Sequence, residues 1–531
     1  MGHRPSVSTL WPTTSSADWT SDKQAHDFDN VGVLCPPEAM SNLELPDWQR
    51  SIDQALRRLD PLSHTGHVYS ACGELIRVRG LSAAIGELCE LRLTVDGVTS
   101  SLGLTEVIAL QGPDLLMSGL TPISNLSSRV QVIALQRRLT VPVGEHLLGR
   151  VLDGLGAPID DGDPLIDEGD ALIDEGPASL KRRSTGRDPR AYRPTQSAPP
   201  SAMRRQPITR PLITGIRAID GLLSCGQGQR IAIFSPSGTG KSSLIAALAR
   251  QCRADVIVLA LVGERGREVG DFVREQLGAS CMQRCVVFAS TSDRPALERI
   301  KCAQTATTVA EQFRSQGKHV LLLVDSITRL ARAQRELALF QGESAANDGF
   351  PPSVYATLPA LLERSGQSEA GAISAFYTVL TEDDDGRDRL AEEVRSIVDG
   401  HIVLTRTLAD DGHFPAIDVL RSVSRLMPKL VSQRHAELAQ QLRAMIAKLA
   451  SIELLVQVGE YRSGSDALAD RALSMRSAIE NFLRQPSLIE TAALNTRTSD
   501  SGKLAGPAER AESEEINLRS ILSMLERLLS R

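Results

Sequence analysis

The residue pattern with the clearest chemistry is the stretch Ser235–Ser242, which reads Ser-Pro-Ser-Gly-Thr-Gly-Lys-Ser. An apolar run precedes it and a helix-forming run follows it, which is the strand–loop–helix setting that a phosphate-binding loop requires. Gly238 and Gly240 allow the backbone to curl so that successive N–H groups face one phosphate. Lys241 is predicted to reach the β- and γ-phosphates, and the Ser242 hydroxyl to ligate Mg²⁺. The residues expected to bind the nucleotide are Pro236, Ser237, Gly238, Thr239, Gly240, Lys241, Ser242 and Ser243.

The first position of such a loop is usually glycine, and in this chain it is Ser235. That position starts the turn, and a small residue can serve there. The alternative interpretation is a glycine-rich turn between a strand and a helix that binds no ligand. The Lys-Ser pair and the flanking elements favour the nucleotide site.

A carboxylate is expected beside the loop, because the apolar run His319–Val324 ends in Asp325. In a parallel sheet the strands end at the same edge, so this side chain is predicted to lie near the loop and to support Mg²⁺. An apolar run followed by aspartate is a weak signal by itself, since many strands end in a turn. Its combination with the phosphate-binding loop favours a metal ligand.

A second carboxylate, Glu264, follows the predicted strand Val256–Ala260 and should emerge at the same edge. A carboxylate in that position can orient and polarise an attacking water. The neighbouring Arg265 could pair with carboxylates or phosphates. Taken alone, Gly-Glu-Arg-Gly at 263–266 is more often a charged turn than a catalytic element.

These residues must be held by a parallel α/β sheet, which we predict over residues 208–428. Continuous apolar runs separated by helix-length segments are typical of strands buried on both faces. The predicted strands are Arg230–Phe234, Val256–Ala260, Cys285–Phe288, His319–Val324 and Ile373–Val379. Short β-like runs over residues 63–158 predict a small barrel. Leucines at helical spacing over residues 429–531 predict a helical domain with a terminal helix.

Two further segments are predicted to lie outside the folded domains. Residues 1–62 are polar and irregular and indicate a mobile N-terminal tail. Within residues 159–207, Asp160–Glu175 has eight acidic residues and no basic one, whereas Lys181–Arg205 has eight basic residues and one acidic. Together with its prolines and serines, this pattern indicates a disordered charged insert. A solvated linker is favoured over a docking patch for an anionic partner.

The composition excludes several classes of protein. The chain has 531 residues and a formal charge of -6, which gives no drive toward nucleic acid or anionic membranes. Only 3% of residues are aromatic, so side chains that could stack on bases are few. No apolar run approaches the roughly 18 residues that span a bilayer, and no secretory signal is visible. The eight cysteines form no CxxC pair and indicate free thiols in a reducing compartment, with Cys281 and Cys285 as ordinary buried thiols.

The chain resembles the hexameric ATPases of the rotary ATP synthase catalytic core, and within them the ATPases of type III protein secretion, including the flagellar export branch. The resemblance covers about residues 149–485, with a looser match in the preceding barrel. The matching blocks are Gly149–Gly156, Thr214–Leu222, Ser235–Ser242, Gly263–Glu268, Val324–Arg329, Gly349–Tyr355, Val398–Val403 and Pro415–Arg425. So many blocks in the same order exclude a chance similarity.

The resemblance implies a multidomain α/β fold with a small N-terminal β-barrel, a P-loop (RecA-like) core and a C-terminal helical domain. It implies ATP and Mg²⁺ as cofactors. Lys241 and Ser242 would bind phosphate and Mg²⁺, Asp325 would support the Mg²⁺, and Glu264 would be the catalytic carboxylate.

Two arginines receive roles from the resemblance. Arg265 would hold the γ-phosphate side of the site, and Arg425 matches the arginine finger that a neighbouring subunit supplies. A guanidinium inserted across an interface stabilises the charge that develops on the transferred phosphoryl group. The residues alone would favour a surface or structural arginine at 425. Because Glu264 and Arg425 lie on one chain, identical subunits arranged head to tail could complete every site, which favours a homohexamer.

The function implied by the resemblance is Mg-ATP hydrolysis that releases and unfolds chaperone-bound cargo for export. Expected partners are stalk and stator-like regulator proteins and chaperone–effector complexes, with peripheral contact at the cytoplasmic face of the inner membrane and no nucleic acid. A flagellar export ATPase is the first alternative, since it shares the chemistry. A rotary synthase catalytic subunit is disfavoured by the pairing of Glu264 and Arg425 on one chain. Charge and composition disfavour an RNA translocase, and the complete motifs disfavour a pure binding module.

Overall fold

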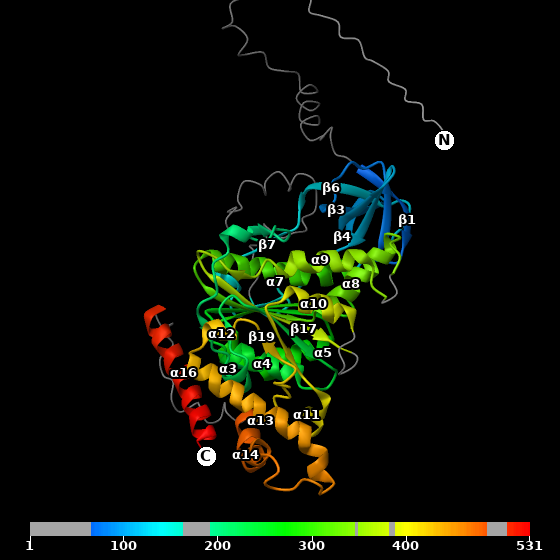
Figure 1. Ribbon diagram of the computed structural model, residues 1–531. Coiled ribbons are helices and arrows are strands. Elements are labelled where there is room, and N and C mark those ends of the chain that lie inside the picture. The colour runs from blue at the N-terminus through cyan, green and yellow to red at the C-terminus, as the bar shows by residue number, and fades with distance from the viewer. Residues whose placement is uncertain (1–64, 163–191, 346–348, 382–387, 486–506, 531) are drawn as a thin grey trace, which may run out of the picture. The chain divides into compact units, whose positions relative to one another are not determined.

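A computed structural model describes residues 65–162, 192–345, 349–381, 388–485 and 507–530 (Figure 1). Residues Leu62–Arg531 form one compact unit. The predicted N-terminal tail, residues 1–62, lies outside the described residues.

The first folded part is a closed barrel, as predicted, and six strands form it. They are β1 (Thr65–Cys72), β2 (Leu75–Arg79), β3 (Glu87–Val95), β4 (Val98–Gln111), β5 (Asp114–Gly119) and β6 (Gln131–Arg138), in the order β1-β2-β5-β4-β3-β6. Inward-facing side chains such as Val78, Val107 and Met117 are fully buried. The β3–β4 hairpin turns through Asp96 and Gly97, both at positive φ, as a two-residue hairpin loop requires.

The second part is a predominantly parallel sheet, and nine of the described strands belong to it. Eight follow the order β19-β18-β12-β17-β15-β13-β14-β8, and β16 pairs with β17. The strands are β8 (Val151–Leu152), β12 (Arg230–Ser235), β13 (Val256–Glu264), β14 (Cys285–Thr291), β15 (His319–Asp325), β16 (Gly366–Gln367), β17 (Ala372–Leu380), β18 (Gly400–Val403) and β19 (Val423–Ser424). Neighbours from β18 to β8 pair in parallel. The five strands predicted for this sheet are confirmed.

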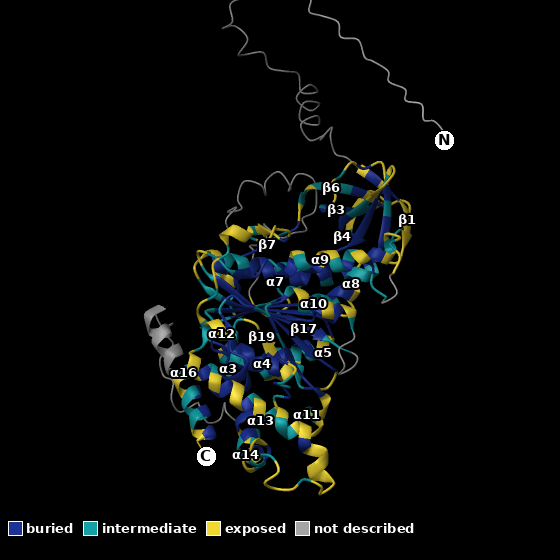
Figure 2. Cartoon of the chain, in the orientation of Figure 1, coloured by how far each residue is buried: buried dark blue, intermediate teal, exposed yellow. Residues whose placement is uncertain are grey.

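Alternate residues of the central strands enter two separate hydrophobic clusters, one on each face of the sheet. Val258 and Ala260 of β13 belong to one cluster, whereas Ile257 and Leu259 belong to the other. The first face is covered by α7 (Ala296–Ser315), α8 (Ile327–Phe340), α9 (Pro352–Leu362) and α10 (Arg389–Ile397). The second is covered by α3 (Arg217–Leu222), α4 (Lys241–Gln251), α5 (Gly266–Asp271), the π-helical turn η4 (Phe272–Leu277) and α6 (Gly278–Met282). This double covering explains why these strands are apolar throughout and dark blue in Figure 2.

The third part is helical, as predicted. It contains α13 (Gln433–Gln457), α14 (Ala467–Leu483) and α16 (Pro507–Leu529). Ser432 and Asp466 start α13 and α14 by accepting hydrogen bonds from backbone N–H groups of the first turn. The predicted stripe of Leu438, Leu442 and Met445 on α13 is buried. It belongs to the same hydrophobic cluster as the helices that cover the second face of the sheet. None of the described helices has an apolar stretch long enough to cross a bilayer.

Short elements complete the described chain. They are β7 (Thr140–Pro142), η1 (Glu145–Leu147), β9 (Tyr192–Pro194), η3 (Ala202–Arg204), β10 (Pro211–Leu212), β11 (Cys225–Gly226), α11 (Arg406–Asp410) and α12 (Met427–Leu430).

The predicted disordered insert, residues 159–207, differs from the structure at both of its ends. The Asp160 carboxylate accepts a hydrogen bond from Arg150 Nη2 at 2.6 Å. Thr195 is buried, and its carbonyl accepts a bond from Arg364 Nη1 at 2.9 Å. Contacts with folded parts therefore fix both ends, and the partner of Thr195 is far away in the sequence, so local composition could not predict it. Residues 163–191 of the insert lie outside the described residues.

A buried ion pair joins the barrel to the helices of the central sheet. The Nζ of Lys301, on α7, lies 2.8 Å from Oε1 and 2.6 Å from Oε2 of Glu106, on β4. The two side chains are only 2% and 6% exposed. Each charge is acceptable at this depth only because the other compensates it.

Replacing Lys301 with methionine should therefore lower the free energy of unfolding by about 3–5 kcal/mol, since Glu106 would keep a buried charge without a partner. Urea unfolding followed by circular dichroism measures the change. Adding Glu106→Leu should restore much of the loss. As a control, Arg79→Met removes the cation of an exposed pair with Asp114 and should cost less than about 1 kcal/mol. Equal costs for both single variants would contradict a special role for the buried pair.

Candidate functional site

The predicted phosphate-binding loop connects the end of β12 to the start of α4. Residues Pro236–Gly240 form the turn, and Lys241, Ser242 and Ser243 begin the helix. Gly238 and Gly240 have φ values of 86° and 82°, which L side chains rarely adopt. The turn therefore aims backbone N–H groups and a helix N-terminus at one point, an arrangement suited to an anion.

Ser235 occupies the first loop position without strain. It ends β12, is fully buried, and is not among the described residues with positive φ. Its Oγ lies 2.7 Å from Thr239 Oγ1 and donates to the Pro236 carbonyl at 2.9 Å. Thr239 Oγ1 also lies 3.0 Å from that carbonyl. The serine thus ties the two ends of the loop together, which a glycine could not do.

The two predicted carboxylates lie at the ends of adjacent parallel strands. Glu264 ends β13 and Asp325 ends β15, with Leu261 opposite Asp325 in the ladder. Lys241 Nζ forms an ion pair with Asp325 and lies 3.8 Å from Glu264 Oε1. Thr378 Oγ1, from β17, donates to Asp325 Oδ1 at 2.8 Å. Strand order, rather than sequence spacing, therefore brings these side chains together.

Glu264 has a second cationic partner. Nη2 of Arg329 donates to its Oε2 at 2.9 Å, and Nη1 of Arg329 donates to the Gly263 carbonyl. Arg329 stands in the first turn of α8, where Ser326 caps the helix by accepting from the Arg329 N–H. Burial raises the pKa of the Glu264 carboxyl above its usual range and Asp325 adds to this, while Lys241 and Arg329 act in the opposite direction. A carboxylate with a raised pKa is a stronger base than an ordinary one.

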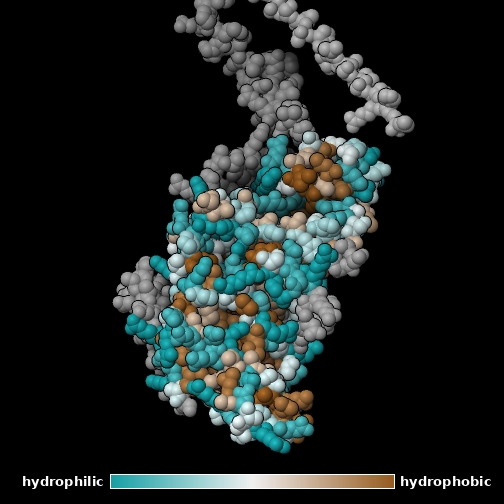
Figure 3. All heavy atoms as spheres, in the orientation of Figure 1, coloured by the Kyte–Doolittle hydropathy of each residue, from teal (hydrophilic) through white to brown (hydrophobic). Residues whose placement is uncertain are grey.

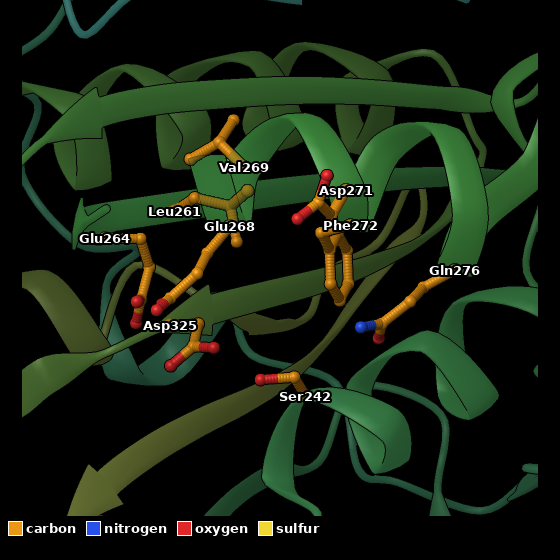
Figure 4. A pocket seen from close by; sticks show the side chains of 9 residues that line it. All are labelled: Ser242, Leu261, Glu264, Glu268, Val269, Asp271, Phe272, Gln276 and Asp325. Carbon is orange, nitrogen blue, oxygen red and sulfur yellow. The ribbon is translucent and has the colours of Figure 1, made fainter. Parts of the chain in front are cut away.

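A cavity of about 200 Å³ opens at this edge of the sheet (Figure 4). It is lined by Ser242, Leu261, Glu264, Glu268, Val269, Asp271, Phe272, Gln276 and Asp325. In Figure 4 the Ser242 hydroxyl faces the carboxylates across the cavity, and Gln276 approaches from the helical side. Gln276 Oε1 is buried and has no hydrogen-bond partner among the described residues. The cavity therefore extends from the start of α4, directly after the loop, to η4.

The donor set fits a hydrated Mg²⁺ ion. Ser242 supplies a hydroxyl, and Asp325, Glu264 and Glu268 supply carboxylates to the same cavity. Hard oxygen donors of this kind are what Mg²⁺ prefers. The ammonium of Lys241 already lies among these carboxylates, which indicates a place where positive charge is stabilised.

The predicted site residues fall into two groups. Lys241, Ser242, Glu264 and Asp325 come together at the cavity. Arg265 does not line it: its side chain is 66% exposed and lies 3.3 Å from Glu268.

Arg425 lies apart from the cavity as well. It is exposed, its N–H donates to the Asp399 carbonyl, and its Nη2 donates to the Arg395 carbonyl at 3.2 Å. It directly follows β19, which pairs with the beginning of β18. Arg425 therefore lies at the amino edge of the sheet, opposite the edge that carries the loop.

Sequence reasoning assigned no role to four residues that contact or line the site: Arg329, Thr378, Glu268 and Gln276. Glu268 ends the matching block Gly263–Glu268, and Arg329 ends the block Val324–Arg329, so membership in these blocks was the signal that could have indicated a role. Thr378 and Gln276 carried no local signal, because only the strand order brings Thr378 to Asp325 and only the course of η4 brings Gln276 to the cavity.

Phe414 is a further residue that the sequence did not single out. Its side chain is 43% exposed, and a Cβ placed on Gly240 would approach its Cε1 to 3.2 Å. An exposed aromatic ring thus lies next to the phosphate-binding loop, and the face of such a ring can stack on a planar base.

Comparisons with known proteins agree with this geometry. Residues 215–424 match the nucleotide-binding domain of the ATP synthase alpha/beta family, and residues 431–497 match the C-terminal domain of the type III secretion ATPase EscN. A type 3 secretion system ATPase of Xanthomonas euvesicatoria is 45% identical over 83% of this chain and 95% of that protein. A flagellum-specific ATP synthase of Treponema pallidum is 44% identical over 81% of this chain and 91% of that protein.

A solved structure is similar over most of the chain. It is the assembled ATPase EscN in complex with its central stalk EscO, from the type III secretion system of enteropathogenic E. coli. The TM-score is 0.70 and the identity 38%, over 87% of this chain and 99% of that one.

The geometry predicts that Asp325→Asn lowers nucleotide affinity only when Mg²⁺ is present. The metal-dependent gain in affinity should fall roughly ten- to a hundredfold, because a carboxylate that supports the ion is lost. Affinity without metal should be unchanged or higher, since Lys241 loses a competing partner. Titration with a fluorescent ATP analogue, with and without Mg²⁺, measures both. Asp114→Asn, on the barrel surface, serves as the control, and equal losses in both titrations would contradict the assignment.

Proposed function

Because this chain belongs to the type III secretion ATPases of the ATP synthase alpha/beta family, we propose that it hydrolyses Mg-ATP in a homohexameric ring and thereby releases and unfolds chaperone-bound cargo for export. The observation that supports this proposal is that charged residues stand at two opposite edges of one sheet. Lys241, Glu264 and Asp325 meet at its carboxyl edge, whereas Arg425 lies exposed at its amino edge.

The residues at the carboxyl edge account for the chemical step. The loop N–H groups bind the phosphates, and Lys241 exchanges its carboxylate partners for the γ-phosphate. Ser242 and Asp325 would hold a Mg²⁺ ion, which when bound would neutralise charge on the phosphate oxygens. Glu264 accepts a proton from the water that attacks the γ-phosphorus, and ADP departs as the bond to its β-phosphate oxygen breaks. Arg329 keeps Glu264 oriented through the bond at 2.9 Å.

Arg425 cannot serve the site of its own chain. Asp399, whose carbonyl accepts the Arg425 N–H, is level with Arg230 at the start of β12, and the loop begins at the other end of that strand. From Arg230 to Ser235 the strand advances five residues, which is roughly 17 Å at about 3.3 Å per residue. An arginine finger at residue 425 would therefore act on the neighbouring subunit. Head-to-tail contacts of this kind close into a ring when all subunits are identical.

Arg265 stands at the mouth of the same site. Its exposed side chain pairs with Glu268, a residue of the cavity wall, and can turn toward a bound nucleotide without breaking buried contacts. We assign it to the γ-phosphate side.

A flagellar export ATPase is the second candidate, and the 44% identity to the Treponema pallidum protein favours it. The two functions share the chemistry and differ in their partners. Cargo chaperones of one pathway, and not of the other, should bind the chain.

One exposed apolar group fits a partner of the ring. The group consists of five residues whose exposed fractions run from 36% to 69%: Leu454, Leu455 and Val456 in the last turn of α13, Val458 directly after it, and Leu468 in the first turn of α14. We call these five residues the tip surface, which lies within the brown group at the lower end of Figure 3. EscN was solved in complex with its central stalk. We propose that the tip surface binds the corresponding stalk protein, and that the stalk, stator-like regulators and chaperone–effector complexes hold the ring peripherally at the cytoplasmic face of the inner membrane.

Mixing two inactive variants tests the proposed ring. Glu264→Gln and Arg425→Ala should each lower ATP hydrolysis, the latter by roughly a thousandfold or more. After mixing in equal amounts and reassembly, about a quarter of the sites should combine an intact Glu264 with an intact Arg425 from the neighbour. Phosphate release measures the recovered activity, and activity of the wild type should rise with protein concentration.

The outcomes of the mixing experiment separate the alternatives. A mixture that stays inactive, or full activity of Arg425→Ala, would contradict completion between subunits. Arg434→Ala is the control, because that arginine is also exposed but pairs with Glu526 in the helical part.

A second variant tests the tip surface. Leu454→Asp with Val458→Asp should weaken binding of the stalk protein by about tenfold or more, because charge replaces exposed apolar area. ATP hydrolysis without the stalk should stay unchanged, since neither residue lines the cavity. Titration of the labelled stalk protein measures affinity. Ser451→Asp adds a charge to the same helix without removing apolar area and should bind normally; loss in both variants would contradict the assignment.

A further inference from the structure

Two thiols lie in direct contact beside the C-terminal end of α4. Sγ of Cys281, in α6, is 3.4 Å from Sγ of Cys285, the first residue of β14. Cys281 is 6% exposed and Cys285 is fully buried. The prediction that both are buried is confirmed, but spacing in the sequence did not reveal that the two sulfur atoms touch.

The surroundings make the two thiols chemically unequal. The hydrogen bond from Cys285 lowers the pKa of the Cys281 thiol, and the positive charges of Arg284 and Arg250 act in the same direction. The same hydrogen bond raises the pKa of the Cys285 thiol, and burial adds to this. Cys281 is therefore the thiol of the two that ionises more readily. A thiolate beside a second thiol is the arrangement of reactive cysteine pairs.

The pair lies at the C-terminal end of α4, the helix whose first residue is Lys241. Sγ of Cys281 is 3.5 Å from the Ala249 carbonyl oxygen. The Arg284 guanidinium donates to the carbonyls of Ala249, Arg250, Cys252 and Ala254, with donor–acceptor distances of 2.9–3.1 Å. The bonds to Ala249 and Arg250 satisfy carbonyls that the end of a helix leaves without intrahelical partners. The thiols therefore belong to the structure that anchors the phosphate-binding helix.

We propose that Cys281 and Cys285 form a reversible redox site that closes into an intrachain disulfide when the protein meets hydrogen peroxide. The Cys281 thiolate attacks one peroxide oxygen, the O–O bond breaks, and hydroxide leaves, which yields a sulfenic acid. Cys285 then attacks the Cys281 sulfur, the S–O bond breaks, and water leaves with the Cys285 proton. In total, two thiols and one peroxide give one disulfide and two waters.

Little movement is needed for this closure. The sulfur atoms must approach by about 1.4 Å to reach a bonded separation of roughly 2.05 Å. Cys285 is held in the sheet between neighbours, whereas α6 is a helix of five residues that begins at Gly278, where φ is 72°. The shift therefore falls on α6 and takes Cys281 away from the Ala249 carbonyl.

Peptide mapping of the full chain tests the proposal without reference to ATP hydrolysis. Reduced protein is treated with hydrogen peroxide, and the remaining thiols are alkylated under denaturing conditions. Trypsin cuts after Arg284, so Cys281 and Cys285 fall on separate peptides. A disulfide-linked pair of these peptides is expected, and dithiothreitol should release it. Exposed Cys72 reports that oxidant was present, and Cys302, which is buried without a described thiol neighbour, should remain alkylated.

A variant identifies the order of the two steps. In Cys285→Ser the reaction should stop at a Cys281 sulfenic acid, which dimedone traps, whereas Cys281→Ser should give neither product. The proposal is overturned if both cysteines of the wild type are still free thiols that become alkylated after peroxide treatment, while Cys72 is oxidised. Trapping of the sulfenic acid on Cys285 instead of Cys281 would overturn the assigned order.

Discussion

The site depends on holding two carboxylates, Glu264 and Asp325, close together at the ends of adjacent strands. Parallel pairing of β13 with β15 forces this proximity, and the partly buried setting makes the repulsion costly unless cations intervene. Lys241 pairs with both carboxylates, and Arg329 binds the remaining oxygen of Glu264. Binding of a metal-bound nucleotide would exchange the partners of these charges within a shape that already exists.

The two cations reach the carboxylates from opposite faces of the sheet. Lys241 begins α4, which packs in one hydrophobic cluster, and Arg329 lies in the first turn of α8, which packs in the other. Both helices start at the carboxyl edge because each follows a parallel strand. The apolar strands thus fix the positions of polar groups that lie beyond their ends. Packing on both faces of the sheet holds the same group of charged side chains in place.

Much of this arrangement could be predicted from the sequence, because its signals are local. Continuous apolar runs predicted the strands, and the loop pattern with Asp325 and Glu264 predicted the centre of the site. Arg329 and Thr378 could not be assigned, since strand order and a helix cap bring them there. The contact between Cys281 and Cys285 depends on the turn between α6 and β14. The ends of the charged insert are fixed by contacts such as that of Arg364 with the Thr195 carbonyl, which composition does not reveal.

Lys241 and Arg425 leave one sheet at opposite edges. Where Arg425 completes a neighbouring site, each subunit has one edge that receives an arginine and another that delivers one. The occupancy of a site is then sensed by the neighbour on one side and not by the neighbour on the other. Such a ring has a sense of circulation, so a wave of hydrolysis can distinguish clockwise from anticlockwise although every subunit has the same sequence.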